Sequence, residues 1–157
     1  MKKLVKIFFL ITVLVTSCRG DINERNPNFL APLSIEIPDN VKNDSELVGI
    51  IESSEKAINE FSDNIEQLAI DGKELLNKKE ENYSLADGLK SGKLMLQFVS
   101  NSTQMATAFE EFNTYVDSKK TQGIINVEQL KALEEIGKSF GNRIDQINIK
   151  YKGLFNY

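Results

Sequence analysis

The sequence predicts an all-α protein, an antiparallel up-down-up three-helix bundle that follows a flexible tether. Three observations predict it. All three prolines lie in the first 38 residues, apolar side chains recur at steps of three and four after residue 43, and polar cap residues interrupt that recurrence twice. The expected boundaries are 1–17 for a signal peptide, 18–43 for the tether and 44–157 for the bundle.

The first 18 residues have the pattern of a bacterial lipoprotein signal. Three lysines precede a nine-residue apolar run, Ile7 to Val15, whereas a membrane-spanning helix needs about twenty residues. Val15-Thr16-Ser17-Cys18 then has the form of a lipobox, in which Cys18 is acylated and becomes the first residue of the mature chain. Two or more acyl chains anchor a protein stably. The alternative is a plain secretory signal with a chance cysteine.

Residues 19–43 are rich in asparagine and hold Pro27, Pro32 and Pro38. Such a composition resists helix formation and predicts a mostly disordered, lipidated tether. Apolar residues between 29 and 37 leave open that this stretch docks on the bundle.

A first long helix is expected from a cap at Asn43, with Glu46 as its partner, to the lysines at 78 and 79. Its apolar seam alternates steps of four and three. The seam consists of Leu47, Ile51, Ser54, Ile58, Phe61, Ile65, Leu68, Gly72 and Leu75.

A second helix is expected to begin at Ser84, with Asp87 as its capping-box partner. Its seam is Gly88, Gly92, Met95, Val99, Ser102, Met105, Phe109, Phe112 and Val116. Further apolar residues widen this face: Leu89, Leu96, Phe98, Ala106 and Ala108. A middle helix that contacts two neighbours needs a wide face, and we favour this interpretation over a ligand groove.

A third helix is expected after a cap at Asn126 with Gln129. Its seam is Val127, Leu130, Leu133, Gly137, Phe140, Ile144, Ile147, Tyr151 and Leu154. Regular seams can also drive self-association as a coiled coil, but the serines and glycines within them favour a monomeric bundle. Phe109 is expected to pack opposite Gly137, and the aromatic end of the third helix opposite Gly72, Gly88 and Gly92.

Composition excludes most chemistry. The chain has no histidine and one cysteine, so Ser-His and Cys-His catalysis and Cys/His zinc sites are not available. After residue 17 it carries 16 basic and 23 acidic residues, a net charge of −7, which disfavours nucleic acid. Residues 88–93 lack the spacing and the hydroxyl residue of a phosphate loop. We therefore expect no catalytic, metal-binding or cofactor-binding residues, and no small-molecule substrate.

The polar turn over residues 117–126 is the candidate partner contact. It places two charges, Lys119 and Lys120, beside two apolar side chains, Ile124 and Ile125. The alternative is that these isoleucines only close the end of the bundle.

The N-terminus MKKLVKIFFLITVLVTSC, followed by a helical domain rich in Lys, Asn, Glu and Ile, resembles the small plasmid-encoded lipoproteins of Borrelia spirochaetes, in particular the OrfD group. The resemblance implies a lipid at Cys18, a location at the outer membrane or cell surface, and binding of a host extracellular protein. Arg19 follows Cys18 in place of the aspartate that retains lipoproteins at the inner membrane of enteric bacteria. The alternative is a structural or periplasmic lipoprotein that contacts envelope proteins or copies of itself.

Overall fold

The computed structural model describes residues 26–152, so Cys18, the expected signal peptide and Leu154 lie outside the described residues. Those residues form four α-helices and no strand: α2 (Asp39–Lys42), α3 (Ser45–Leu76), α4 (Leu85–Thr121) and α5 (Val127–Tyr151). A single 3₁₀ turn, η1 (Glu80–Asn82), lies between α3 and α4. The prediction of an all-α protein is confirmed.

Side-chain caps set the starts of the long helices. Ser84 with Asp87 and Asn126 with Gln129 form reciprocal capping boxes, as predicted. The cap of α3 was misplaced by one residue. Asp44, not Asn43, accepts the Leu47 amide, because the preceding short helix α2 ends there and takes Asn43 as its C-cap.

The turn between α4 and α5 is shorter than the ten residues expected. Helix α4 continues to Thr121, and Gln122 is its C-cap. Lys119 and Lys120 lie in the last helical turn, where positive charge interacts favourably with the helix dipole. The chain then leaves the helix through Gly123, whose φ of 68° is a conformation that glycine adopts at no steric cost.

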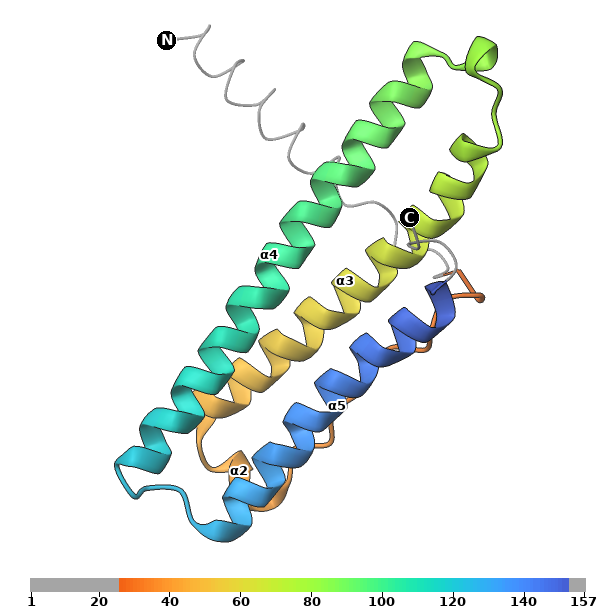
Figure 1. The fold of residues 1–157 in the computed structure, drawn as a ribbon. Coiled ribbons are helices and arrows are strands. Elements are labelled where there is room, and N and C mark those ends of the chain that lie inside the picture. Colours follow the sequence, from red (N-terminus) through yellow and green to blue (C-terminus); the bar gives the residue numbers. More distant parts are fainter. Residues whose placement is uncertain (1–25, 153–157) are drawn as a thin grey trace, which may run out of the picture.

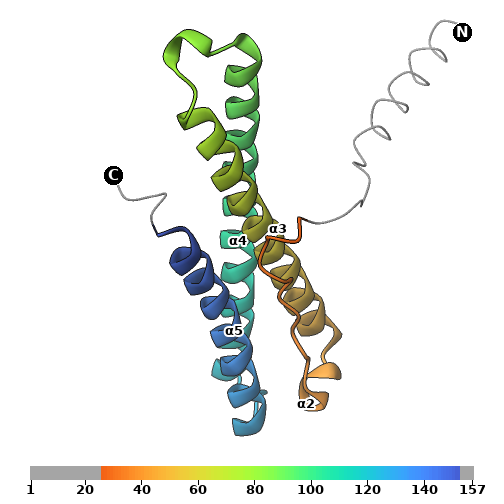
Figure 2. The same cartoon turned by 90° about the vertical axis from the view of Figure 1, so that its right-hand side faces the viewer.

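Three long helices lie side by side, and α3 and α4 extend beyond the end of α5 (Figure 1). The molecule thus has two regions. In the three-helix part, α5 packs beside α3 and α4. In the two-helix end, the last turns of α3 and the first turns of α4 have only each other as neighbours among the described helices (Figure 2).

The apolar core lies in the three-helix part. Phe140 of α5 stacks on Phe109 with ring centroids 5.3 Å apart, and meets Phe112 edge-on at 5.8 Å. The buried members of the core are Val41, Leu47, Ile51, Ile58, Phe112, Leu133, Ile136 and Phe140. Most of the predicted α3 seam residues are buried. In the α5 seam Leu133, Phe140 and Ile147 are buried and most of the others half-buried, whereas the α4 seam is exposed in its first half and half-buried in its second, where Phe112 alone is buried.

One packing prediction is right about the side of α5 but not about the residue, and a second is wrong. Phe109 stacks on Phe140, one turn from Gly137 on the same side of α5. The atom nearest to a Cβ position at Gly137 is Cε1 of Phe112, at 3.9 Å, so that Phe112 rather than Phe109 faces this glycine. At Gly72, Gly88 and Gly92 no described atom lies within 4 Å of a Cβ position. Tyr151, at the end of α5, is bonded to Glu66 of α3. Gly72 lies further along α3, and Gly88 and Gly92 lie at the start of α4, so α5 ends before the level of these glycines.

Residues 28–40, here called the N-terminal segment, lie along the long helices and are bonded to both α3 and α5 (Figure 2). Asn59 of α3 exchanges two hydrogen bonds with the backbone of Leu33, donating to its carbonyl at 2.8 Å and accepting from its amide at 2.7 Å. Leu33, Ile35 and Ile37 pack against the core. The sequence left open whether residues 29–37 dock on the helices, and in the structure they do. From Asn28 on, the chain therefore differs from the disordered tether expected over 18–43.

Candidate functional site

The four residues predicted to contact a partner do not act as one group. Lys119 pairs with Asp44 at 3.7 Å and lies 4.9 Å from the ring centroid of Tyr115, so its charge is engaged within the bundle. Ile125 is partly buried against the core, as the alternative interpretation expected. Lys120 and Ile124 are exposed, Ile124 by 57%. The structure therefore divides the tip into two residues that close the bundle and two that face solvent.

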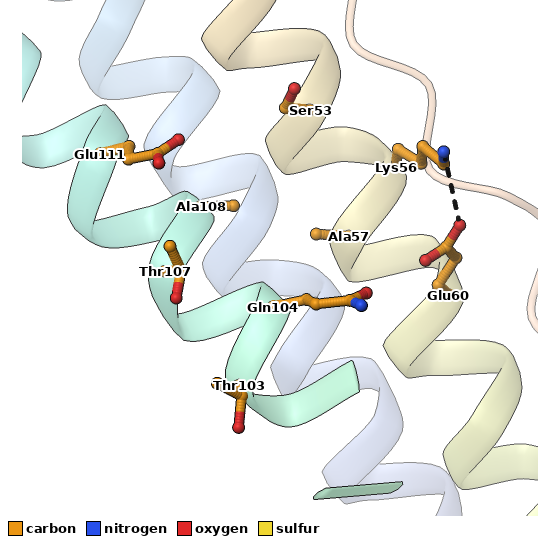
Figure 3. A pocket seen from close by; sticks show the side chains of 9 residues that line it. All are labelled: Ser53, Lys56, Ala57, Glu60, Thr103, Gln104, Thr107, Ala108 and Glu111. Atoms are coloured by element: carbon orange, nitrogen blue, oxygen red, sulfur yellow. Dashed lines mark ion pairs between the residues drawn. The ribbon is translucent and has the colours of Figure 1, made fainter. Parts of the chain in front are cut away.

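A shallow groove runs between α3 and α4 on an open face of the molecule (Figure 3). Its volume is about 330 Å³, and small side chains, Ala57 and Ala108, form its floor. The ion pair between Lys56 and Glu60, at 3.9 Å, lies at its edge (Figure 3). Its lining combines the carboxylates of Glu60 and Glu111 with hydroxyl side chains and the amide of Gln104. These groups are spread along the groove and do not form a cluster of the kind that a catalytic site uses.

An apolar cavity lies at the boundary between the two regions. It has a volume of about 530 Å³. Its lining residues are Phe61, Ile65, Leu68, Met95, Phe98, Met105, Ile144, Ile147 and Asn148. Asn148 is the one polar side chain among these nine. Ligand sites usually combine apolar walls with several convergent polar groups, and this cavity lacks them.

A buried acid joins the N-terminal segment to α3 and α5. The carboxylate of Glu66, which has no exposed surface, accepts the Leu30 amide at 2.6 Å, the Tyr151 hydroxyl at 2.7 Å and the Lys150 ammonium at 2.5 Å. Burial alone would raise the pKa of Glu66, but these three donors outweigh it and hold the pKa below the ordinary value. Burial and the neighbouring carboxylate raise the pKa of Tyr151, which remains a neutral donor.

This Glu66 cluster is structural in kind. Every oxygen of the carboxylate faces a donor from the same chain, and Lys150 also donates to the carbonyl of Asn28 at 2.5 Å. A general acid or base has to face the group that it protonates or deprotonates. Among residues 26–152 no three acidic side chains lie close enough together to hold a metal ion.

The outer face of α4 is the surface that the sequence analysis misjudged. Leu89, Leu96 and Val99 were expected to contact neighbouring helices, yet all three are exposed. Met95 is exposed too, but it lines the apolar cavity together with residues of α3 and α5, as expected for a side chain between neighbouring helices. The side of α4 that meets α3 in this region carries Leu94 and Asp87 instead, and both are buried. The absence of charge from residues 94–109, in a chain that is 27% charged, marks this stretch as unusual but does not separate its two faces.

Other sources of information about function are few. Within the described part of the chain, no helix has both the length and the hydropathy that crossing a bilayer requires. Comparison with protein-family models, curated proteins and solved structures finds no match to this chain.

Proposed function

We propose that this protein is a lipid-anchored, non-enzymatic surface lipoprotein of a bacterium, of the Borrelia type, that binds a host extracellular protein through an exposed helical surface. The observation that carries the proposal is Val15-Thr16-Ser17-Cys18 after a lysine-rich start and a nine-residue apolar run. Acylation of Cys18 would fix the chain in the outer membrane with the helical domain facing outward.

The domain is proposed to be an antiparallel up-down-up three-helix bundle. Short polar connections after α3 and after α4 support this topology, because neighbouring helices joined by such loops reverse direction. The course of the colours along α3, α4 and α5 in Figure 1 agrees with it.

The docked N-terminal segment limits how far the domain stands from the lipid. Nine residues, 19–27, separate Cys18 from Asn28, whose carbonyl accepts a hydrogen bond from Lys150 near the end of α5. A fully extended stretch of this length spans at most about 32 Å. The proposed anchor therefore holds the domain near the membrane, on a link much shorter than the 26-residue tether expected over 18–43.

The α4–α5 tip is the part of the surface best placed for a partner. Lys150 lies 23 residues beyond Val127, so the tip is about 35 Å along α5 from the level at which the segment enters. It presents Lys120, Ile124 and Val127 to solvent. Exposed apolar side chains at the core of a small patch, with a charge at its polar rim, match the general anatomy of a protein-binding surface.

Protease treatment of intact cells tests the location, and a pull-down from host serum and matrix proteins tests the binding. We expect the protein to be lost on treatment, and we expect Cys18→Ala to leave an unprocessed chain without lipid label. Ile124→Asp should reduce capture of a host protein without changing the melting temperature. Ile125→Asp should lower the melting temperature, because that side chain packs against the core.

A second candidate, an envelope lipoprotein that contacts other envelope proteins or itself, is favoured by the exposed apolar face of α4. The two candidates differ in the protease result. Protection of the protein in intact cells, with digestion only after the outer membrane is opened, would support the second and contradict surface display.

A further inference from the structure

The N-terminal segment is held on the long helices by bonds to its backbone. Residues 29–37 lie outside every helix and strand, so no regular element pairs their amides and carbonyls. Side chains of α3 and α5 bond these groups one at a time. The bonds are those of Glu66 with Leu30, Asn59 with Leu33, Glu55 with Ile35, Arg143 with Ala31 and Lys150 with Asn28.

Only one side of the segment is covered. Its side chains alternate between half-buried and exposed, as they do in an extended chain. The half-buried ones are Leu33, Ile35 and Ile37, and the exposed ones are Pro32, Ser34 and Glu36. An element with few buried contacts opens at a lower free energy than the core that it covers. We therefore expect the segment to leave the helices before the helices themselves unfold.

Glu66 is the attachment most sensitive to protonation. Its carboxylate has no exposed surface, and its bonded neighbours, the Leu30 amide, the Lys150 ammonium and the Tyr151 hydroxyl, are all donors. A protonated carboxyl carries an O–H group, which is itself a donor. At each of these three contacts the added proton would set a donor against a donor. The site is therefore built for the ionised acid.

Protonation of Glu66 would not be offset by another charge nearby. Residues 28–35 of the segment and residues 94–109 of α4 carry no charged side chain. Both α5 cations of the cluster donate to carbonyls of the segment, and burial with the adjacent carboxylate raises the pKa of Tyr151, which stays neutral. The titratable and charged groups on the helices beside Glu66 are Lys150, Tyr151 and Arg143 of α5 and Asp63, one turn earlier on α3.

We propose that Glu66 is an acid-sensitive latch: protonation of its carboxylate releases residues 28–37 from α3 and α5 while the long helices stay folded. Burial alone would raise the pKa of Glu66, but the three donors outweigh burial and hold the pKa of the docked state below the ordinary value of 4.5. Docking is therefore at full strength above pH 4.5. Between the ordinary and the lowered pKa it weakens about tenfold for each pH unit.

Release changes both the length of free chain and the surface of the helices. Ten residues, 28–37, leave the helices, and such a stretch spans at most about 36 Å when fully extended. The side of α3 and α5 that carries Asn59 and Arg143 becomes accessible to solvent or to a partner. The latch does not depend on a lipid at Cys18, because every residue in it lies between Asn28 and Tyr151.

Nuclear magnetic resonance of backbone amides in the full chain tests the latch, from about pH 7 to about pH 3, a range that brackets the ordinary carboxyl pKa. The Leu30 amide reports the bond to Glu66, and the Leu33 amide reports docking, because its partner Asn59 does not titrate. Below pH 4.5 we expect both amides to lose their bonded chemical shifts in one step. The amides of Phe112 and Phe140 should keep theirs.

Three results of this titration would overturn the proposal. A Leu30 amide that does not titrate would show that Glu66 stays ionised over the whole range. A Leu33 amide that stays bonded while Leu30 titrates would show that the carboxyl protonates without releasing the segment. Loss of the Phe112 and Phe140 shifts in the same step would show global unfolding in place of local release.

Two glutamines give a matched pair of variants. Glu66→Gln cannot carry the charge, and at pH 7 its Leu33 amide should exchange with solvent about tenfold faster than in the wild type, with no further acid step. Glu55→Gln, on the same helix and bonded to the same segment, should keep the acid step of the wild type. An acid step that persists in Glu66→Gln, or that disappears in Glu55→Gln, would overturn the proposal. If Glu66→Gln does not fold, the wild-type titration and Glu55→Gln decide the question.

Discussion

The three-helix part and the two-helix end contain similar residues in different surroundings. Helix α4 passes through both. In the three-helix part its apolar side chains meet α3 on one side and α5 on the other, as Phe112 does. In the two-helix end it presents Leu85, Leu89 and Leu96 to solvent, while Leu94 alone is buried against α3. The burial of an apolar residue on α4 thus depends on whether another element lies opposite the side of the helix that carries it.

The polar groups follow the same division. In the three-helix part a buried carboxylate, Glu66, is bonded by two helices and the N-terminal segment. In the two-helix end the ion pairs of Asp87 with Lys78, at 2.5 Å, and of Lys90 with Asp71, at 2.8 Å, join only α3 and α4 or the turn between them. We expect the first region to carry most of the global stability and the second to open locally at lower cost.

The largest expected difference between the regions comes from their apolar side chains. Phe140→Ala removes a ring that is 3% exposed and contacts two other rings, and should lower the free energy of unfolding by about 3–5 kcal/mol. Leu96→Ala removes an exposed side chain and should change it by less than about 0.5 kcal/mol. Urea unfolding of dilute protein measures both values. Similar losses for the two variants would mean that the two-helix end is as tightly packed as the core.

The buried acid gives the next largest effect and a pH dependence. Glu66→Gln removes the charged partner of Lys150 and leaves that ammonium the Asn28 carbonyl, and it should cost about 1.5–3 kcal/mol at pH 7 because hydrogen bonds to a charged group are lost. The folded state holds the pKa of Glu66 below its ordinary value of 4.5, so the wild-type contribution exists above pH 4.5 and is lost as the pH falls below it.

Urea unfolding between pH 3 and pH 7, a range chosen to bracket the ordinary carboxyl pKa of about 4.3, should therefore show a smaller acid loss in Glu66→Gln than in the wild type. Glu52→Gln, at an exposed carboxylate of the same helix, is the control. An acid loss of the same size in wild type and Glu66→Gln would contradict the assignment.

A pair of glycines sharpens the comparison at a single position in each region. Gly137 faces Phe112 at 3.9 Å, and Gly137→Leu should destabilise by about 1–3 kcal/mol because the added carbons overpack the core. At Gly92 no described atom lies within 4 Å of a Cβ position, so Gly92→Leu should instead raise the free energy of unfolding by about 0.5–1 kcal/mol through helix propensity. Thermal melting of the two variants checks both signs. Melting temperatures shifted in the same direction would show that the two sites are not packed differently.

The smallest expected effect concerns the N-cap of α4. Ser84→Ala removes the side chain that accepts the Asp87 amide and should cost about 1 kcal/mol, confined to the two-helix end. Hydrogen exchange should accelerate in the first turns of α4 and stay unchanged at Phe112 and Phe140. Asn126→Ala, at the cap of α5, is the counterpart in the three-helix part, and its effect should reach the core. Exchange that accelerates throughout the chain in Ser84→Ala would contradict local opening.

The sequence by itself predicted the three long helices, two of their three caps and the burial of most α3 seam residues. These features are local, because a cap bonds within three residues and a helical seam repeats within seven. The missed cap at Asp44 is also informative. The short helix α2 before it buries Val41 against the core. A helix of four residues is too short to show a helical repeat in the sequence, so the sequence did not predict it.

Only the tertiary structure decided which apolar residues are covered and where the N-terminal segment lies. Leu94 and Leu96 are two residues apart and equally apolar, yet one is buried and the other exposed, because α3 lies on one side of α4 and no described helix lies on the other. The segment docks because Glu66 and Asn59 bond its backbone from positions 26 or more residues away. Burial and long-range hydrogen bonds depend on what lies opposite in space, and a pattern along the chain does not contain that information.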